Sequence, residues 1–343
     1  MTSILESKKE IENILLGIEE VQGVGISSDR QSIIVYVSTV TDQLLQIVPG
    51  VIAGYRVIVK EVGIFKPSQD FVATTADPTR LWRYRPVVGG ISSGHYAITA
   101  GTLGCVVKDA TTGQPMLLSN NHVYAATSTD QTQRAQVSDP VLQPGSFDGG
   151  RIEDTVGTLA RWIPIKVNSA NAVDAAIANS TYQPSPYILG ENNEYIQVKR
   201  LKTVTQGIPV KKAGRTTGLT VGNIIDTDYT GMVDYNDGQV LTFTDQLLVS
   251  IMIQGGDSGS LLLDENDNAV GLLFAGAQDN YGNYYGVANK INTVFSLLQI
   301  ELPSGEEPEE PEPEPESNGW LAALALAAPI ALLALGSIKM NGK

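Results

Sequence analysis

The chain has 343 residues, a formal net charge of −14 and one cysteine, Cys105. This length allows two or three domains, and a single cysteine excludes an intrachain disulfide. No block of basic residues occurs, which argues against nucleic acid as a partner, and 34 glycines with 17 prolines favour β structure.

Residues 1–63 predict a small α+β domain. Ser3 and Glu6 have the spacing of a capping box at the start of a helix. A second helix is expected over residues 41–48, and strands are expected over 21–27, 32–37 and 55–62. Together they predict a three-stranded sheet under two helices. The domain is either a prosegment or regulatory module or a packing domain, and the sequence leaves both open.

Residues 64–84 have no clear period and predict an irregular connector. The Gly89-Gly90 pair that follows is typical of a hairpin turn. Because Pro86 comes directly after Arg85, cleavage there to create a new N-terminus is not expected.

Two β-rich halves follow, over residues 85–180 and 204–300, and a polar linker, 181–203, joins them. In each half short apolar runs alternate with turns every 8–12 residues. The pattern predicts two barrels or two sandwiches and does not choose between them.

The C-terminal residues predict a membrane anchor. Residues 301–319 hold eight glutamates and no lysine or arginine, which predicts an extended spacer. Residues 320–338 carry no charge and are long enough to span a bilayer, and residues 339–343 are a short tail. The alternative is an apolar tail that packs on the protein or on a partner. Lys339 and Lys343 favour a cytosolic C-terminus, yet the charged N-terminus predicts no signal peptide; sidedness therefore stays open.

The chemistry is expected at residues 254–260, where glycines surround Ser258 between two apolar runs. Glycines permit a sharp turn and bring backbone N–H groups together. A serine in such a turn could act as a nucleophile beside an oxyanion hole.

A base and an acid are then needed to activate the serine. The two histidines are His122, which follows an apolar strand, and His95, which lies in a turn-rich stretch; His122 is the better candidate. Asp174 lies within an apolar run, where a carboxylate needs a partner, whereas the surroundings of Asp154 are typical of a solvated turn.

The order His122, Asp174, Ser258 over residues 85–300 resembles that of the trypsin-like (chymotrypsin-fold) serine peptidases, as do six local stretches. These stretches are residues 118–122, 174–178, 213–222, 255–260, 271–276 and 285–291. The resemblance is closest to bacterial members, and residues 89–95 with the N-terminal domain also resemble the plant Narrow-leaf-type proteins. It implies two six-stranded antiparallel β-barrels, with base and acid in the first and nucleophile in the second.

The resemblance also implies the roles of individual residues. His122 is the general base, Asp174 orients it, and the N–H groups of Gly256 and Ser258 form the oxyanion hole. Asp257 shapes the turn and needs a buried partner, because the freed N-terminus that serves animal members is doubtful here. The residues matching the primary pocket predict a preference for small or apolar side chains: Met252, Phe274, Gly276 and Gly286.

These expectations describe a membrane-tethered serine endopeptidase that acts on proteins or peptides. The alternatives are an inactive binding or scaffolding module and a protease limited to self-processing. No metal site or cofactor is expected, since two histidines and one cysteine suit no ordinary zinc site.

Overall fold

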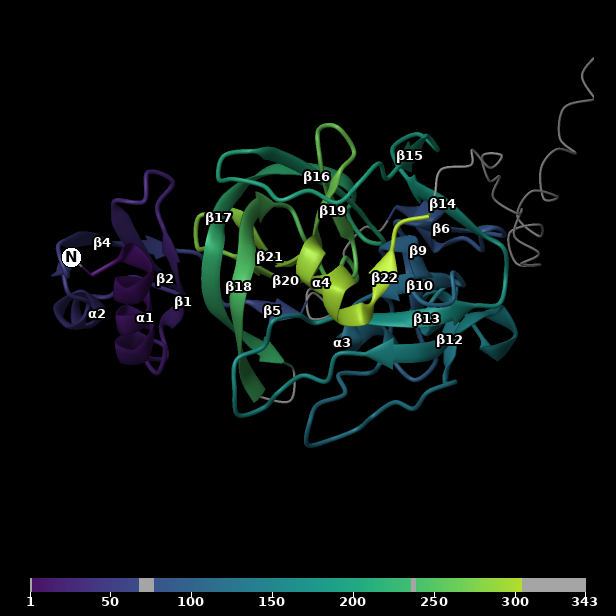
Figure 1. Cartoon of the computed structure of the whole chain (residues 1–343), viewed down its shortest axis with the longest axis horizontal. Coiled ribbons are helices and arrows are strands. Elements are labelled where there is room, and N and C mark those ends of the chain that lie inside the picture. The colour runs from purple at the N-terminus through teal and green to yellow at the C-terminus, as the bar shows by residue number, and fades with distance from the viewer. Residues whose placement is uncertain (1, 68–76, 236–238, 304–343) are drawn as a thin grey trace, which may run out of the picture.

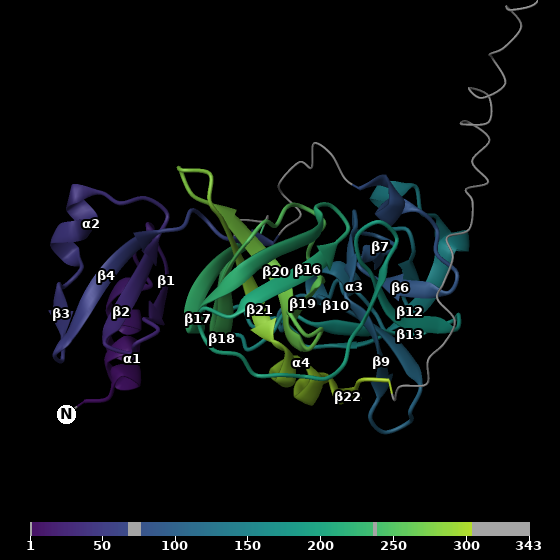
Figure 2. The same ribbon diagram turned by 90° about the horizontal axis from the view of Figure 1, so that it is seen from above.

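The computed structural model describes residues 2–67, 77–235 and 239–303 of the chain. Three parts follow one another across the molecule: an N-terminal unit, the C-terminal β half and the first β half (Figures 1 and 2). The expected mainly β architecture is confirmed. Of the predicted spacer, 301–319, only residues 301–303 are described, and Glu301 belongs to strand β22; the rest of the spacer and the predicted apolar stretch, 320–338, lie outside the described residues.

The N-terminal unit begins with the helix that the capping box predicts. The Ser3 side chain accepts a hydrogen bond from the Glu6 N–H, and the Glu6 carboxylate accepts one from the Ser3 N–H. β1 pairs antiparallel with β2, and β2 pairs parallel with β4. The elements are α1 (Ile4–Leu15), β1 (Val21–Ile26), β2 (Ser32–Val37), α2 (Asp42–Ile47), β3 (Val51–Ile52) and β4 (Tyr55–Glu61).

The C-terminal half closes into a six-stranded antiparallel barrel. Its strands run in the order β16-β19-β20-β21-β18-β17, and β16 pairs back onto β17. They are β16 (Pro209–Gly214), β17 (Gly218–Tyr235), β18 (Gln239–Ile251), β19 (Leu261–Asp264), β20 (Ala269–Gln278) and β21 (Tyr284–Lys290).

The first half contains an eight-stranded sheet, with its strands in the order β22-β9-β10-β13-β12-β11-β7-β8. The Gly104 N–H between β8 and β9 donates to the Leu118 carbonyl of β10 (2.9 Å), which draws the two parts of the sheet together. Its strands are β7 (Ile91–His95), β8 (Gly101–Leu103), β9 (Cys105–Asp109), β10 (Pro115–Ser119), β11 (Pro140–Leu142), β12 (Thr155–Trp162), β13 (Ala176–Ser180) and β22 (Ile300–Glu301).

Smaller elements connect these parts. A three-stranded sheet holds β6 (Val87–Gly89), β14 (Pro184–Leu189) and β15 (Tyr195–Gln197), and β5 (Lys66–Pro67) joins the barrel edge. The remaining helices are α3 (Asn121–Tyr124), α4 (Ile291–Leu298) and three 3₁₀ turns, Pro78–Leu81, Ser146–Asp148 and Ile152–Asp154.

The N-terminal sheet is not the separate three-stranded layer that the sequence predicts. β1 pairs antiparallel with β17, with Gly23 opposite Gly231, so the N-terminal strands, together with β5, extend the barrel sheet to eleven strands. Glycine permits this approach, because a Cβ at position 23 would lie 2.4 Å from the Tyr229 ring. The N-terminal unit is therefore built onto the barrel.

The hairpin predicted at Gly89-Gly90 is wrong. β6 pairs parallel with β14, whereas β7 pairs with β8 and β11, so the two strands beside Gly90 enter different sheets. Gly90 has φ +79°, which suits a corner between sheets as well as a hairpin turn.

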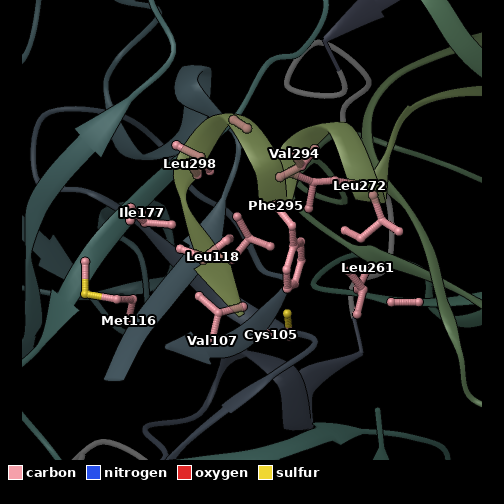
Figure 3. Close-up of a cluster of buried hydrophobic side chains, with 14 of the residues drawn as sticks. Cys105, Val107, Met116, Leu118, Ile177, Leu261, Leu272, Val294, Phe295 and Leu298 are labelled. Carbon is pink, nitrogen blue, oxygen red and sulfur yellow. The ribbon is translucent and has the colours of Figure 1, made fainter. Parts of the chain in front are cut away.

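One apolar cluster joins the two β halves beneath α4 (Figure 3). Cys105 and Leu118 come from the first half, Leu261 and Leu272 come from the barrel, and Phe295 of α4 packs among them. All are buried, and burying apolar surface contributes about 25 cal/mol per Å². This shared core fixes the orientation of the two halves between which the site lies.

Candidate active site

His122 lies in α3, directly after β10, and is fully buried. Its ring Nδ1 lies 2.5 Å from Asp174 Oδ2, and its backbone N–H donates to Asp174 Oδ1 (3.2 Å). The carboxylate thus holds both the ring and the main chain of the histidine. This fixes the ring with Nε2 directed away from Asp174.

Asp174 lies just before β13, so the apolar run around it is only partly strand. Its backbone is held instead by two asparagines. The Asn120 amide donates to the Asp174 carbonyl (2.8 Å), as does the Asn289 amide (3.1 Å), and the Asp174 N–H donates to Asn289 Oδ1 (3.1 Å). The first half and the barrel therefore both position the acid.

Tyr235, the last residue of β17, donates its hydroxyl to Asp174 Oδ2 (2.7 Å). Burial, and then the charge and hydrogen bond of Asp174, raise the pKa of Tyr235 well above its ordinary value, so the tyrosine is a donor at neutral pH. Its ring also meets the His122 ring edge-on, with centroids 6.2 Å apart. Sequence reasoning gave no role to Tyr235, Asn120 or Asn289. Asn120 and Asn289 lie in stretches that resemble the peptidases, but their contacts with Asp174 arise only through the fold.

Ser258 lies in the turn between β18 and β19, and its hydroxyl donates to the Phe274 carbonyl of β20 (3.2 Å). The flanking Gly256 and Gly259 have φ +96° and +95°, a region that residues with a Cβ rarely adopt. The turn is bound to the first half, since the Thr102 N–H donates to the Ser258 carbonyl (2.8 Å).

The nucleophile turn and the histidine helix meet at Gly101 of β8. A Cβ at this position would lie 2.6 Å from Val123, next to His122, and 3.1 Å from the Ser258 carbonyl oxygen. The Phe274 ring also packs on Phe243, with centroids 4.6 Å apart. The segments that carry His122 and Ser258 thus meet where the two β halves join.

Asp257 has the buried partner that the sequence could not name. Lys212 Nζ lies 3.3 Å from Asp257 Oδ2, and neither side chain is exposed. The carboxylate also accepts from the N–H groups of Gln254 (3.0 Å), Thr216 (2.9 Å) and Thr217 (3.0 Å). Burial lowers the pKa of Lys212, and the Asp257 charge opposes that shift. The pair holds the nucleophile turn against the β16–β17 turn.

The predicted pocket residues lie around β20. Phe274 is buried, and Gly276 of β20 pairs with Gly286 of β21. A Cβ at position 276 would lie 2.5 Å from Ile253, so glycine allows close packing there. Met252 is 39% exposed and follows β18. The neighbours of Phe274, Gly276 and Gly286 are apolar.

The rival candidates lie in other interactions. His95 Nε2 lies 3.1 Å from Asp139, and its Nδ1 accepts from the Ala97 N–H (3.2 Å). Asp154 forms an ion pair with Arg83 (3.3 Å) and accepts a hydrogen bond from the Arg151 N–H (3.0 Å). Neither interaction includes Ser258.

One protein family and several solved structures are similar to this chain. Residues 153–299 match the model of peptidase family S64. No curated protein matches the chain. Solved structures similar to it include Thermobifida fusca protease A (19% identity, TM-score 0.48), Cellulomonas bogoriensis chymotrypsin (17%, 0.47) and Nocardiopsis protease (18%, 0.47). Each alignment covers 64% of this chain and 99% of the other.

The match to peptidase family S64 spans both Asp174 and Ser258. The fold is chymotrypsin-like, and over residues 153–299 the chain is similar to peptidase family S64.

Proposed function

We propose that the protein hydrolyses internal peptide bonds through an acyl-enzyme on Ser258. The buried His122–Asp174 pair carries this proposal, because a carboxylate 2.5 Å from one ring nitrogen fixes the imidazole as a base at the other. His122 takes the Ser258 proton as the oxygen attacks the carbonyl carbon, and then gives it to the leaving amine. Water, activated by the same base, releases the acid product.

Charge develops on the carbonyl oxygen during the attack, and the N–H groups of Gly256 and Ser258 are the proposed donors to it. The φ of +96° at Gly256 sets the direction of that peptide, which requires glycine. Losing one such donor costs about 10²–10³ in rate in studied enzymes. Asp174 stabilises the imidazolium and is itself held by Tyr235.

Hydrolysis of a mixed peptide library by the full chain tests the proposal. We expect cleavage by the wild type, none above background by Ser258→Ala, and wild-type cleavage by Ser250→Ala. Ser250 is a fair control because its hydroxyl bonds Asn223 between two strands, away from the nucleophile turn. Equal cleavage by wild type and Ser258→Ala would assign the activity to another group.

The C-terminal residues supply a second, separable part of the proposal, which is that residues 320–338 tether the peptidase to a membrane. The support comes from the sequence alone: the 19 residues from Trp320 to Ile338 carry no charge, and Lys339 follows them. Among the described residues, no helix is both long and apolar enough to cross a bilayer.

Flotation of the full chain with phosphatidylcholine vesicles tests the tether. Leu326→Arg places a charge within the stretch, which costs about 2.5–3.5 kcal/mol at a helix centre. We expect the wild type to float and resist alkaline extraction, and the variant to remain largely in the soluble fraction. Equal flotation and extraction of the two proteins would contradict the tether, and it would leave the proposed peptidase chemistry unaffected.

A further inference from the structure

The chain that leaves the N-terminal unit runs along the edge of β20. A Cβ on Gly63 would lie 2.2 Å from the Gln278 carbonyl oxygen, so the two backbones meet there. Farther on, β5 pairs antiparallel with β20, with Lys66 opposite Gly276 and Pro67 opposite Ala275. Residues 63–67 therefore follow β20 from its end toward its middle.

This edge of β20 lies next to Ser258, the proposed nucleophile. The position before Ala275 is Phe274, whose carbonyl accepts the Ser258 hydroxyl (3.2 Å). β21 pairs with one side of β20 throughout, and β19 pairs with the other side up to Leu272. β5 takes that second side at the two residues beyond Phe274. An extended peptide bound by strand addition beside Ser258 needs the same backbone groups.

Phe65 anchors the segment. Its side chain is fully buried, with its ring centroid 5.8 Å from that of Tyr229, and its carbonyl accepts from the Asp234 N–H (2.9 Å). Lys66 adds a weaker, exposed ion pair with Asp234 at 3.7 Å. Ile64, between the buried Gly63 and Phe65, is 50% exposed and makes a natural comparison.

We propose that residues 62–67 form a tethered inhibitory strand, which occupies the β20 edge where the backbone of an extended peptide substrate binds. The proposal rests on the proposed peptidase function and adds its regulation. Ser258 is fully buried while β5 is paired, in keeping with a closed state. The apparent affinity for a substrate falls in proportion to the fraction of molecules in which the edge is open.

Phe65→Ala tests the proposal against Ile64→Ala in the full chain, with an uncharged peptide amide as the substrate. Removing the buried ring weakens the strand but leaves its backbone groups in place. If the edge is open in about a tenth of wild-type molecules, freeing it raises kcat/KM about tenfold. We expect that rise in Phe65→Ala and no change in Ile64→Ala. An unchanged or lower kcat/KM in a folded Phe65→Ala protein overturns the inhibitory strand.

Two further measurements keep the result interpretable. Gly63→Val forces a side chain onto the Gln278 carbonyl and should give the same rise if Phe65→Ala fails to fold. A synthetic peptide of residues 60–67 should inhibit Phe65→Ala by raising KM without lowering kcat, and the same peptide with alanine at position 65 should inhibit less. No inhibition by the first peptide at millimolar concentration contradicts the assigned edge.

Fluorophosphonate labelling of the same samples separates the two proposals. Labelling of both chains without a gain in kcat/KM overturns the strand and leaves the peptidase function standing. Absence of labelling in wild type and Phe65→Ala overturns the peptidase function and, with it, the strand. Intact mass is recorded in parallel, and loss of residues 62–67 by cleavage in the wild type contradicts a stable inhibitory strand.

Discussion

Lys212 and Asp257 form a buried ion pair beside the nucleophile, with Nζ 3.3 Å from Oδ2 and neither side chain exposed. Asp257 also binds the N–H groups of Gln254 and Thr216, so the pair fixes the turn that presents Ser258. The buried cation is a side chain of the barrel itself. The turn is therefore held without a newly cleaved N-terminus.

Lys212→Met should impair both stability and activity. Removing one partner leaves a buried carboxylate uncompensated, which typically costs about 3–5 kcal/mol. We expect a lower midpoint of thermal unfolding and a fall in kcat/KM of at least about tenfold. Adding Asp257→Asn should recover part of the stability, and a double variant no more stable than Lys212→Met would argue against direct coupling.

Tyr235→Phe should lower kcat with little change in KM. The tyrosine donates to Asp174, and hydrogen bonds to charged groups contribute about 1.5–3 kcal/mol, or about tenfold or more in rate if the contribution acts at the transition state. Steady-state kinetics on a peptide amide measures this effect. Tyr36→Phe is the control, because it removes a buried tyrosine–aspartate bond at the N-terminal interface. Equal kcat values for the two variants would remove Tyr235 from the positioning of Asp174.

Asp226 should make the N-terminal interface pH-sensitive. It lies in β17 and accepts from the Ile26 N–H and the Tyr36 hydroxyl, and burial raises its pKa from 3.8 to about 6. The folded state then binds more protons than the unfolded state between these values, so its stability falls as pH rises from about 4 to about 6, by at most about 3 kcal/mol.

The difference in unfolding free energy between wild type and Asp226→Asn isolates this effect. Denaturant titration at pH 4, 5, 6 and 7 should show the loss of stability only in proteins that keep Asp226. Asp228→Asn is the matched control, since that neighbour makes a partly exposed ion pair with Arg30. A parallel pH profile for wild type and Asp226→Asn would contradict the raised pKa.

The primary pocket should prefer small or apolar side chains. The residues proposed to shape it are uncharged, and Phe274, Gly276 and Gly286 lie among apolar neighbours such as Ile253 and Val249. A library of amides that varies the residue before the cleaved bond measures the preference. Faster cleavage after arginine, lysine or glutamate than after alanine or leucine would refute it.

The sequence predicted the parts of the site that glycine spacing and chain order encode. The turn around Ser258 could be recognised because Gly256 and Gly259 are needed for its left-handed backbone. Ser3 and Glu6 likewise mark a helix start through local bonding. Such features depend on neighbours in the chain, which a sequence displays.

Contacts between distant segments could not be predicted in the same way. Lys212, Tyr235 and Asn289 reach the site through barrel closure, and their local sequence is that of ordinary strands. The pairing of β1 with β17 depends on Gly23 facing Tyr229 more than 200 residues later, and nothing near Gly23 indicates it. The position of β5 on β20 is a contact of the same kind.

The most direct test of the account is to map where a fluorophosphonate attaches to the folded full chain. Because His122 is the proposed base and its helix meets the Ser258 turn at Gly101, we predict one covalent adduct on Ser258. Digestion and mass spectrometry locate it. Labelling should be lost in Ser258→Ala and slowed at least about a hundredfold in His122→Ala, as general-base catalysis implies. No adduct on well-folded wild type, or an adduct on a different residue, would contradict the central claim.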